Sequence, residues 1–249
     1  MPTFSFMARA EKRKLWDILL NIVVILFSLW GILSAVFNIL DCDKDHWNWG
    51  WKVFKYYTND SNMLGSLACL LIAIYHIRYF KEDKPLPIGL IYLKLIGASS
   101  MLFTFFTVVA TMGNVFTFWA LFGFPSTLFL HTLSPLLCTF TFLFFDDSHL
   151  KKRFATISFV PILVYSFAWV MALLILNLPK EVELDNNVCP YFFLAIHNQP
   201  WYISALWIVG LSSLHYGVCL GLLCLKNLIT KRREKQLSEK GSENSRKNS

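Results

Sequence analysis

A chain of 249 residues with 55% hydrophobic and only 16% charged residues is too apolar for an ordinary soluble domain, in which about a quarter of the residues are charged. Its net charge of +7 would suit a nucleic-acid-binding protein, but the basic residues cluster between long apolar stretches. Composition therefore excludes a soluble nucleic-acid binder and predicts an all-α integral membrane protein.

Six stretches are long and apolar enough to cross the hydrocarbon core, which takes about 20 residues. In chain order they are residues 16–40, 61–80, 89–112, 125–145, 154–178 and 201–225. The first is too long for a cleavable signal peptide and is not followed by a small-residue cleavage site. Because the connecting segments are short, we expect one bundle of six transmembrane helices in which neighbours are mostly antiparallel.

The basic residues predict the topology of this bundle. Nineteen of the 23 lysine and arginine residues lie before the first segment, around the loop after the second, between the fourth and fifth, or after the sixth. By the positive-inside rule, these parts and both termini are cytosolic. The expected organisation is a basic N-terminus at 1–14, a six-helix membrane domain at 15–226 and a basic, disordered tail at 227–249.

Cysteine usage adds one open question. Four cysteines fall in or at the edge of apolar segments and are expected to be small core residues: Cys69, Cys138, Cys219 and Cys224. Cys42 and Cys189 lie in the predicted outer loops. They form a disulfide if that side is oxidising, and otherwise remain two free thiols.

The start of the second segment carries the first polar interruption of the apolar pattern. Residues 56–62 read YYTNDSN, with Thr58 in third place and Ser61 and Asn62 three and four residues later. In a helix these three side chains share one face. We expect the helix to start near Trp51, which places Thr58 about two turns into it, near the outer surface.

The fourth segment carries the second interruption, His131, followed by Pro135. Ionisable side chains inside membrane helices are costly and usually face the bundle or a cavity. Because Pro135 has no N–H, the carbonyl of His131 loses its usual helix partner and a kink is expected there. The second and fourth segments both run inward from the outer side, so Thr58 and His131 lie at similar depths and contact between them is permitted.

Three interpretations of these residues stay open from the sequence. A hydroxyl nucleophile needs a base within hydrogen-bond reach, and histidine is the usual one, so Thr58 and His131 are candidates for a catalytic pair. A structural polar contact between helices is the second interpretation. A metal site with His131, His197 and Asp60 is the third, but no two of these ligands lie three or four residues apart on one helix. We therefore predict neither a metal nor a cofactor.

Polar residues also occur in the third and sixth segments. Four hydroxyl side chains of the third segment share one helical face, which serves either helix packing or a substrate-lining wall: Ser100, Thr104, Thr107 and Thr111. Lys94 is expected to extend to the cytosolic headgroups. His215 is expected to be a hydrogen-bonded core residue.

Three motifs resemble the androgen-induced-gene-like family of six-span membrane proteins, which includes the androgen-dependent TFPI-regulating protein. The first is residues 56–62, similar to the family's aromatic-aromatic-Thr-x-x-Ser-Asn motif. The second is HTLSP at 131–135 with Asp146 at the helix exit, and the third is CPYFFL at 189–194 before the last span. The order of the motifs and the number of spans also agree over nearly the whole chain, and the chain looks closest to the bacterial branch.

The resemblance implies a threonine hydrolase of lipid esters. In animal members, a threonine matching Thr58 and a histidine matching His131 are needed to hydrolyse fatty acid esters of hydroxy fatty acids. Thr58 would be the nucleophile and His131 the general base, while Ser61, Asn62 or backbone amides would stabilise the oxyanion. The loop at 185–201 is expected either to cap this pocket, with His197 as a secondary substrate contact, or simply to anchor the sixth span.

The substrate implied is a membrane lipid or fatty-acyl ester, reached in a bacterial plasma membrane that the chain crosses several times. The alternative to the hydrolase is a non-enzymatic membrane protein, either a small transporter or a ligand-binding or structural protein with a polar outer pocket. Transporters often carry inverted repeats and broken helices. Apart from Pro135 and Pro161, the sequence has no such feature.

Overall fold

The computed structural model describes residues 4–37, 39, 50–82, 84–111, 118–145, 148–175, 191, 194 and 199–247, and in these residues it is all-helical without a strand. The α-helices are α1 (Phe4–Phe37), α2 (Tyr57–Arg78), α3 (Ile88–Thr111), α5 (Pro125–Thr127), α6 (Ser134–Phe144), α7 (Phe159–Ile175) and α8 (Trp201–Lys247). The 3₁₀-helices are η1 (Gly50–Lys55) and η4 (Lys152–Ser158), and the π-helices are η2 (Trp119–Gly123) and η3 (Leu128–Leu133).

Six helical stretches are long and apolar enough to cross a membrane, which confirms the prediction of a multi-pass helical protein. Four of them are single helices. The fourth span joins α5, η3 and α6 end to end, and the fifth joins η4 to α7. The predicted segments therefore match helices in the same order, and the differences are at their ends.

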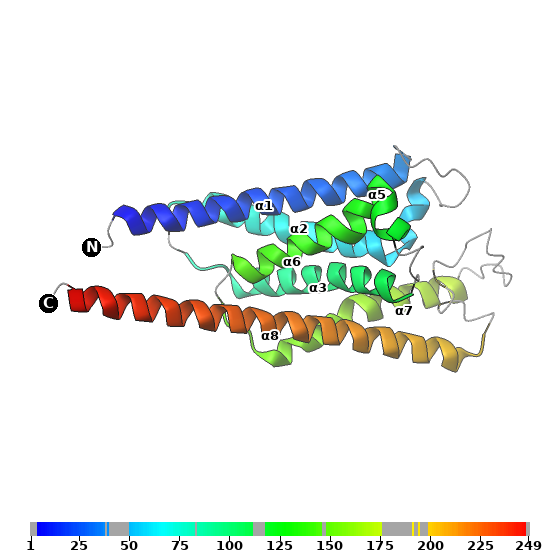
Figure 1. Ribbon diagram of the computed structural model, residues 1–249. Helices are drawn as coiled ribbons and strands as arrows, with labels where there is room; N and C mark the ends of the chain where they lie inside the picture. The colour runs from blue at the N-terminus through cyan, green and yellow to red at the C-terminus, as the bar shows by residue number, and fades with distance from the viewer. Residues whose placement is uncertain are drawn as a thin grey trace.

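Helix α3 lies at the centre of the bundle. It contacts α2, α6 and α8, and Figure 1 shows it between the α1–α2 pair and α8. Its buried residues include Leu95, Ala98 and Met101, all fully enclosed. This position agrees with the single charged residue of α3, Lys94, because a charge inside a membrane bundle is costly unless polar partners surround it.

Two glycines bring α2 and α3 into backbone contact. A Cβ atom placed on Gly97 would lie 2.7 Å from the Cα atom of Gly65, and a Cβ on Gly65 would lie 2.2 Å from the sulfur of Met101. Small residues permit such close crossings between membrane helices, where van der Waals packing replaces the hydrophobic effect as the driving force. A third glycine, Gly31 of α1, faces Leu130 of η3 in the same way.

The first turns of α1 and the last turns of α8 lie at the same end of the bundle (Figure 1), as an even number of spans requires. Three cations at this end bind the C-terminal carbonyls of α6. Arg13 and Arg233 donate to the carbonyl of Phe144 at 2.9 and 2.8 Å, and Lys226 donates to the carbonyl of Phe142 at 3.1 Å. Cations stabilise a helix C-terminus because its carbonyls lack helical partners and carry partial negative charge.

Helix α8 differs from the expected disordered tail at 227–249, because it continues without a break to Lys247. The segment after Lys226 contains no proline and one glycine and is rich in Lys, Arg and Glu, which are good helix formers. An apolar transmembrane helix directly before it supplies the nucleus, so each added residue only extends an existing helix.

Candidate functional site

Thr58 lies in the first turn of α2, two turns closer to the helix start than the sequence suggested. The 3₁₀-helix η1 ends at Lys55, and Tyr56 adopts an extended conformation with φ −90° and ψ 131°. This residue interrupts the helix, so the expected start near Trp51 was wrong. The amide of Asn59 donates to the carbonyl of Tyr56 at 3.0 Å and fixes the beginning of α2.

Asn62 joins the turn of Thr58 to the π-helix that carries His131. Its side-chain amide donates to the carbonyl of Thr58 at 2.8 Å and to the carbonyl of Leu130 at 3.0 Å. Its amide oxygen accepts from the hydroxyl of Ser28 in α1 at 3.3 Å. Asn62 is fully buried, so one side chain connects three helical segments around the two predicted site residues.

The π-helix η3 accounts for the contact between Asn62 and Leu130. In a π-helix each carbonyl pairs with the amide five residues later, and the amide of Ser134 accordingly donates to the carbonyl of Phe129. The next carbonyl, that of Leu130, would pair with residue 135. Because residue 135 is a proline without an N–H, the Asn62 amide takes its place. In an α-helix, Pro135 would instead leave the carbonyl of His131 without a donor, as expected from the sequence. In the π register, the carbonyl without a backbone donor is that of Leu130, one residue earlier.

His131 lies in η3, next to the bridged carbonyl of Leu130. Its Nδ1 atom is buried and has no hydrogen-bond partner in the described part of the chain, so this nitrogen is not bonded to Thr58. Buried polar atoms are nearly always paired. His215 Nδ1 is also buried without a partner among the described residues, so what distinguishes His131 is its place in a π-turn, a feature frequent at functional sites.

The donors of Ser61 and Asn62 are already used by the fold. Ser61 donates its hydroxyl to the carbonyl of Thr58 at 2.9 Å, and both amide hydrogens of Asn62 bind carbonyls, as described above. An asparagine has two side-chain N–H donors and a serine has one. Neither side chain has a donor left for an oxyanion, so both position Thr58 in this arrangement.

Tyr191 is a site neighbour that the sequence did not single out as a functional residue. Its phenol lies close to the Thr58 side chain and to the Tyr57 backbone. Its ring packs edge-on against Tyr56 at 6.1 Å and Tyr165 at 6.2 Å between centroids. The CPYFFL motif could have identified Tyr191 as a site residue, because a tyrosine after a proline near a membrane surface combines an apolar ring with a polar hydroxyl.

The remaining candidates are placed as follows. Asp60 lies in the first turn of α2, where the helix dipole stabilises a carboxylate. His197 and the cysteines Cys42 and Cys189 lie outside the described residues. In the described ranges, no group of three His, Cys, Asp or Glu residues could hold a metal ion.

The hydroxyl face of α3 and the neighbouring His215 form part of the core. Thr104 and Thr107 donate to carbonyls of their own helix at 2.7 and 2.8 Å. His215 is fully buried, and its Nε2 lies 3.2 Å from the hydroxyl of Ser99 and 3.4 Å from that of Ser100. These contacts agree with helix packing, the simpler of the two interpretations of this face.

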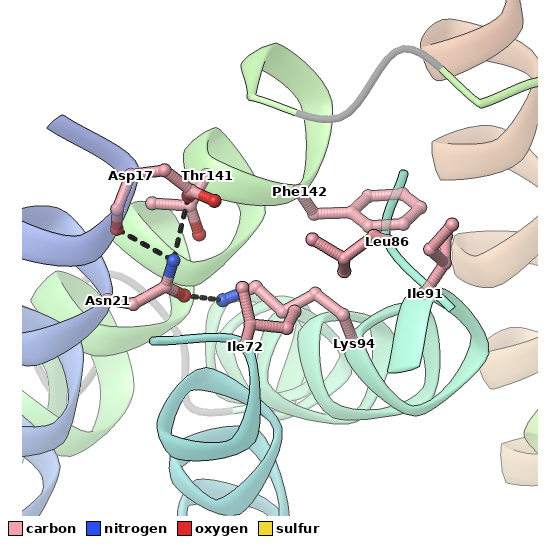
Figure 2. Close-up of a pocket in the computed structure, with 8 residues that line it drawn as sticks. All are labelled: Asp17, Asn21, Ile72, Leu86, Ile91, Lys94, Thr141 and Phe142. Atoms are coloured by element: carbon pink, nitrogen blue, oxygen red, sulfur yellow. Dashed lines mark hydrogen bonds between the residues drawn. The ribbon is translucent and has the colours of Figure 1, made fainter. Parts of the chain in front are cut away.

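A second polar cluster joins α1, α2 and α3 (Figure 2). Lys94 is 3% exposed and donates to Asn21 Oδ1 at 2.6 Å, while Asn21 donates to Asp17 Oδ1 at 2.7 Å. Asp17 also contacts His76 Nε2 at 3.0 Å. The expectation that Lys94 extends to the headgroups was wrong, because α1 and α2 supply polar partners inside the bundle.

The three comparisons with known proteins add no relative. No family model, no curated protein and no solved structure matches this chain.

Proposed function

We propose that this chain is an intramembrane threonine-dependent hydrolase of lipid esters, with Thr58 as nucleophile and His131 as general base. The observation that carries the proposal is the Asn62 bridge, which links the carbonyl of Thr58 to the helical turn of His131. We propose with it that the chain belongs to the androgen-induced-gene-like family that its motifs resemble. A bacterial plasma membrane, with both termini cytosolic, is the proposed location.

The proposed reaction follows from the chemistry of the two side chains. His131 takes the proton of the Thr58 hydroxyl as its oxygen attacks the acyl carbonyl, and later gives that proton to the leaving alcohol. The unpaired Nδ1 of His131 supports a base that is free to bind the nucleophile once substrate is present. Catalytic hydrogen bonds are often long in unliganded enzymes and shorten in the substrate complex.

Stabilisation of the oxyanion falls to groups other than Ser61 and Asn62, since their donors are occupied. The amides in the first turn of α2 are one source, apart from that of Asn59, which binds the Tyr56 carbonyl, because the first N–H groups of a helix have no intrahelical partner. The phenol of Tyr191, which lies close to the Thr58 side chain, is the other. Tyrosine hydroxyls are established donors in oxyanion holes.

The proposal is tested with a fluorophosphonate probe and an ester panel on protein purified in detergent. Wild type should be labelled and should hydrolyse long-chain acyl esters, and Thr58→Ala and His131→Ala should each lose turnover by several orders of magnitude. Thr107→Ala is the matched control, because its hydroxyl binds the carbonyl of Phe103 in its own helix. Labelling that persists in both Thr58→Ala and His131→Ala would contradict the assignment of Thr58 as nucleophile and His131 as general base.

A non-enzymatic ligand-binding protein is the second candidate. It is favoured by the same atom, because His131 Nδ1 is not bonded to Thr58. Absence of turnover across the ester panel would select this candidate if a fatty-acyl ester still raised the melting temperature of wild type but not of Thr58→Ala.

A further inference from the structure

The ammonium group of Lys94 lies unusually close to a thiol inside the bundle. Its Nζ atom is 2.7 Å from Sγ of Cys69 in α2, and both residues are buried, at 3% and 0% exposure. N–H···O hydrogen bonds have a typical length of about 2.9–3.0 Å, and sulfur is larger than oxygen. The contact is therefore short for an N–H···S hydrogen bond. The two atoms are about as far apart as a nitrogen and a sulfur that are both bonded to the same oxygen atom.

The surroundings of this pair leave room for a very small molecule only. Lys94 lines a cavity of about 20 Å³ whose other walls are apolar (Ile72, Leu86, Ile91 and Phe142) and polar (Asp17, Asn21 and Thr141) (Figure 2). A cavity of this size holds one water-sized molecule. Dioxygen is small and apolar, so it partitions into hydrocarbon and into apolar protein interiors.

We propose that Lys94 and Cys69 are a covalent modification site, at which dioxygen joins Nζ to Sγ through a single oxygen atom. The proposal does not depend on the hydrolase assignment. It joins α2 to α3, two helices already in backbone contact at Gly65 and Gly97. No new backbone movement is needed, because the nitrogen and sulfur atoms already lie together.

The reaction balances with dioxygen as the only oxidant. In the charged form of the pair, the ammonium first gives its proton to the thiolate, which leaves a neutral amine and a thiol. The S–H bond, one N–H bond and the O–O bond then break, and one S–O and one O–N bond form. The two released hydrogens leave with the second oxygen as water. Sulfur and nitrogen together lose four electrons, and dioxygen gains four.

The bridge removes a buried charge as well as adding a link. An ammonium inside a membrane protein is costly unless it is paired, and Asp17 is connected to Lys94 through the amide of Asn21. In the bridged form the nitrogen is neutral. Asp17 then keeps His76 as its partner at 3.0 Å.

Cys138 of α6 offers a competing product. It is fully buried and lies beside Cys69, so oxidation could instead form a Cys69–Cys138 disulfide. The two products differ in composition. The bridge gains one oxygen and loses two hydrogens, whereas a disulfide loses two hydrogens and gains no oxygen.

The experiment compares intact masses of the full chain in detergent after purification without oxygen, after exposure to air, and after exposure to isotopically labelled dioxygen. We expect air to add one oxygen and remove two hydrogens, the added oxygen to carry the label, and a phosphine reductant to reverse the change. Digestion should then give one cross-linked peptide pair containing Lys94 and Cys69. The mass change should persist in Cys138→Ser and be lost in Cys69→Ser and Lys94→Arg.

Three outcomes would overturn the proposal. Loss of two hydrogens without oxygen would identify a disulfide or a direct sulfur–nitrogen bond, and gain of oxygen without loss of hydrogen would identify a sulfenic acid or methionine sulfoxide. An unchanged mass after exposure to air would show that the pair is only a hydrogen bond. Each of these is read on wild type, so a variant that fails to fold does not leave the result open.

Discussion

The side-chain amide of Asn62 donates to the carbonyl of Leu130 at 3.0 Å, the carbonyl that Pro135 leaves without a partner in the π register of η3. This relationship sets the position of the proposed site. A donor from α2 compensates for a missing amide in the fourth span, and the two segments that carry Thr58 and His131 are held together as a result.

Replacement of Asn62 by alanine should destabilise the protein. The change removes both donors and leaves the Leu130 carbonyl buried without a partner, which costs about 1–3 kcal/mol. The free energy of unfolding in detergent micelles measures this loss. Ser61→Ala is the matched control in the same turn, because Ser61 binds only the Thr58 carbonyl of its own helix, and its effect should be smaller.

Pro135→Ala should partly rescue Asn62→Ala. An alanine at 135 supplies the amide that a π-helix needs for the Leu130 carbonyl, so the double variant should lose less stability than the sum of the two single variants. Contacting residues show coupling energies of about 0.5–3 kcal/mol in such cycles. If the stability changes of Asn62→Ala and Pro135→Ala were strictly additive in the double variant, Asn62 would not be replacing the amide that residue 135 lacks.

The close crossing of α2 and α3 predicts a second stability effect. A Cβ at Gly97 meets the backbone of Gly65 at 2.7 Å, so Gly97→Ala forces the helices apart and should cost about 1–3 kcal/mol. Gly210 of α8 has open space around its Cβ position. Gly210→Ala should be neutral or stabilising by about 0.5–1 kcal/mol, since alanine is the better helix former. Equal losses of stability in Gly97→Ala and Gly210→Ala would show that the close crossing of α2 and α3 is not the cause of the effect at Gly97.

Tyr191→Phe should lower the catalytic rate if Thr58 is the nucleophile. The change keeps the ring contacts with Tyr56 and Tyr165 and removes only the hydroxyl. Loss of one oxyanion donor typically lowers kcat by about 10²–10³-fold with little change in KM. Tyr165→Phe is the control, because its hydroxyl binds the carbonyl of Lys55 and its loss should reduce stability more than kcat. Unchanged kcat in Tyr191→Phe would assign the phenol a structural role only.

Cysteine labelling from outside the cell decides the proposed topology. In a background with Cys42 and Cys189 replaced by serine, a cysteine at Asn186 should react with an impermeant maleimide in intact cells. A cysteine at Glu82, in the loop after α2, should react only after permeabilisation. The reverse pattern would overturn the proposed topology and the placement of Thr58 near the outer surface.

Much of the fold was predictable because the bilayer imposes a simple rule. A segment inside hydrocarbon must satisfy its backbone internally and be apolar over about 20 residues, so the spans can be read from composition alone. Their ends were less predictable. The second helix begins only after the extended residue Tyr56, and α8 continues beyond its expected end. The first boundary depends on a local turn and the second on helix propagation, and hydropathy measures neither.

The site was only partly predictable. Helical periodicity placed Thr58, Ser61 and Asn62 on one face. His131 was identified because an ionisable side chain inside a membrane helix is energetically costly. The partner of each donor could not be derived, because a hydrogen bond between residues 68 positions apart, such as that from Asn62 to Leu130, depends on the packing of α2 against η3.

The sequence by itself determined the six apolar helices, their order and the polar residues that interrupt them, because hydropathy and helical period are local properties. Only the tertiary structure decided that Lys94 lies inside the bundle, that η3 adopts a π register before Pro135, and that Asn62 closes the resulting vacancy. Each of these depends on which helices meet and at what distance. That choice is made by glycine contacts such as Gly65 with Gly97 and by the pairing of buried donors, which single positions in a sequence do not encode.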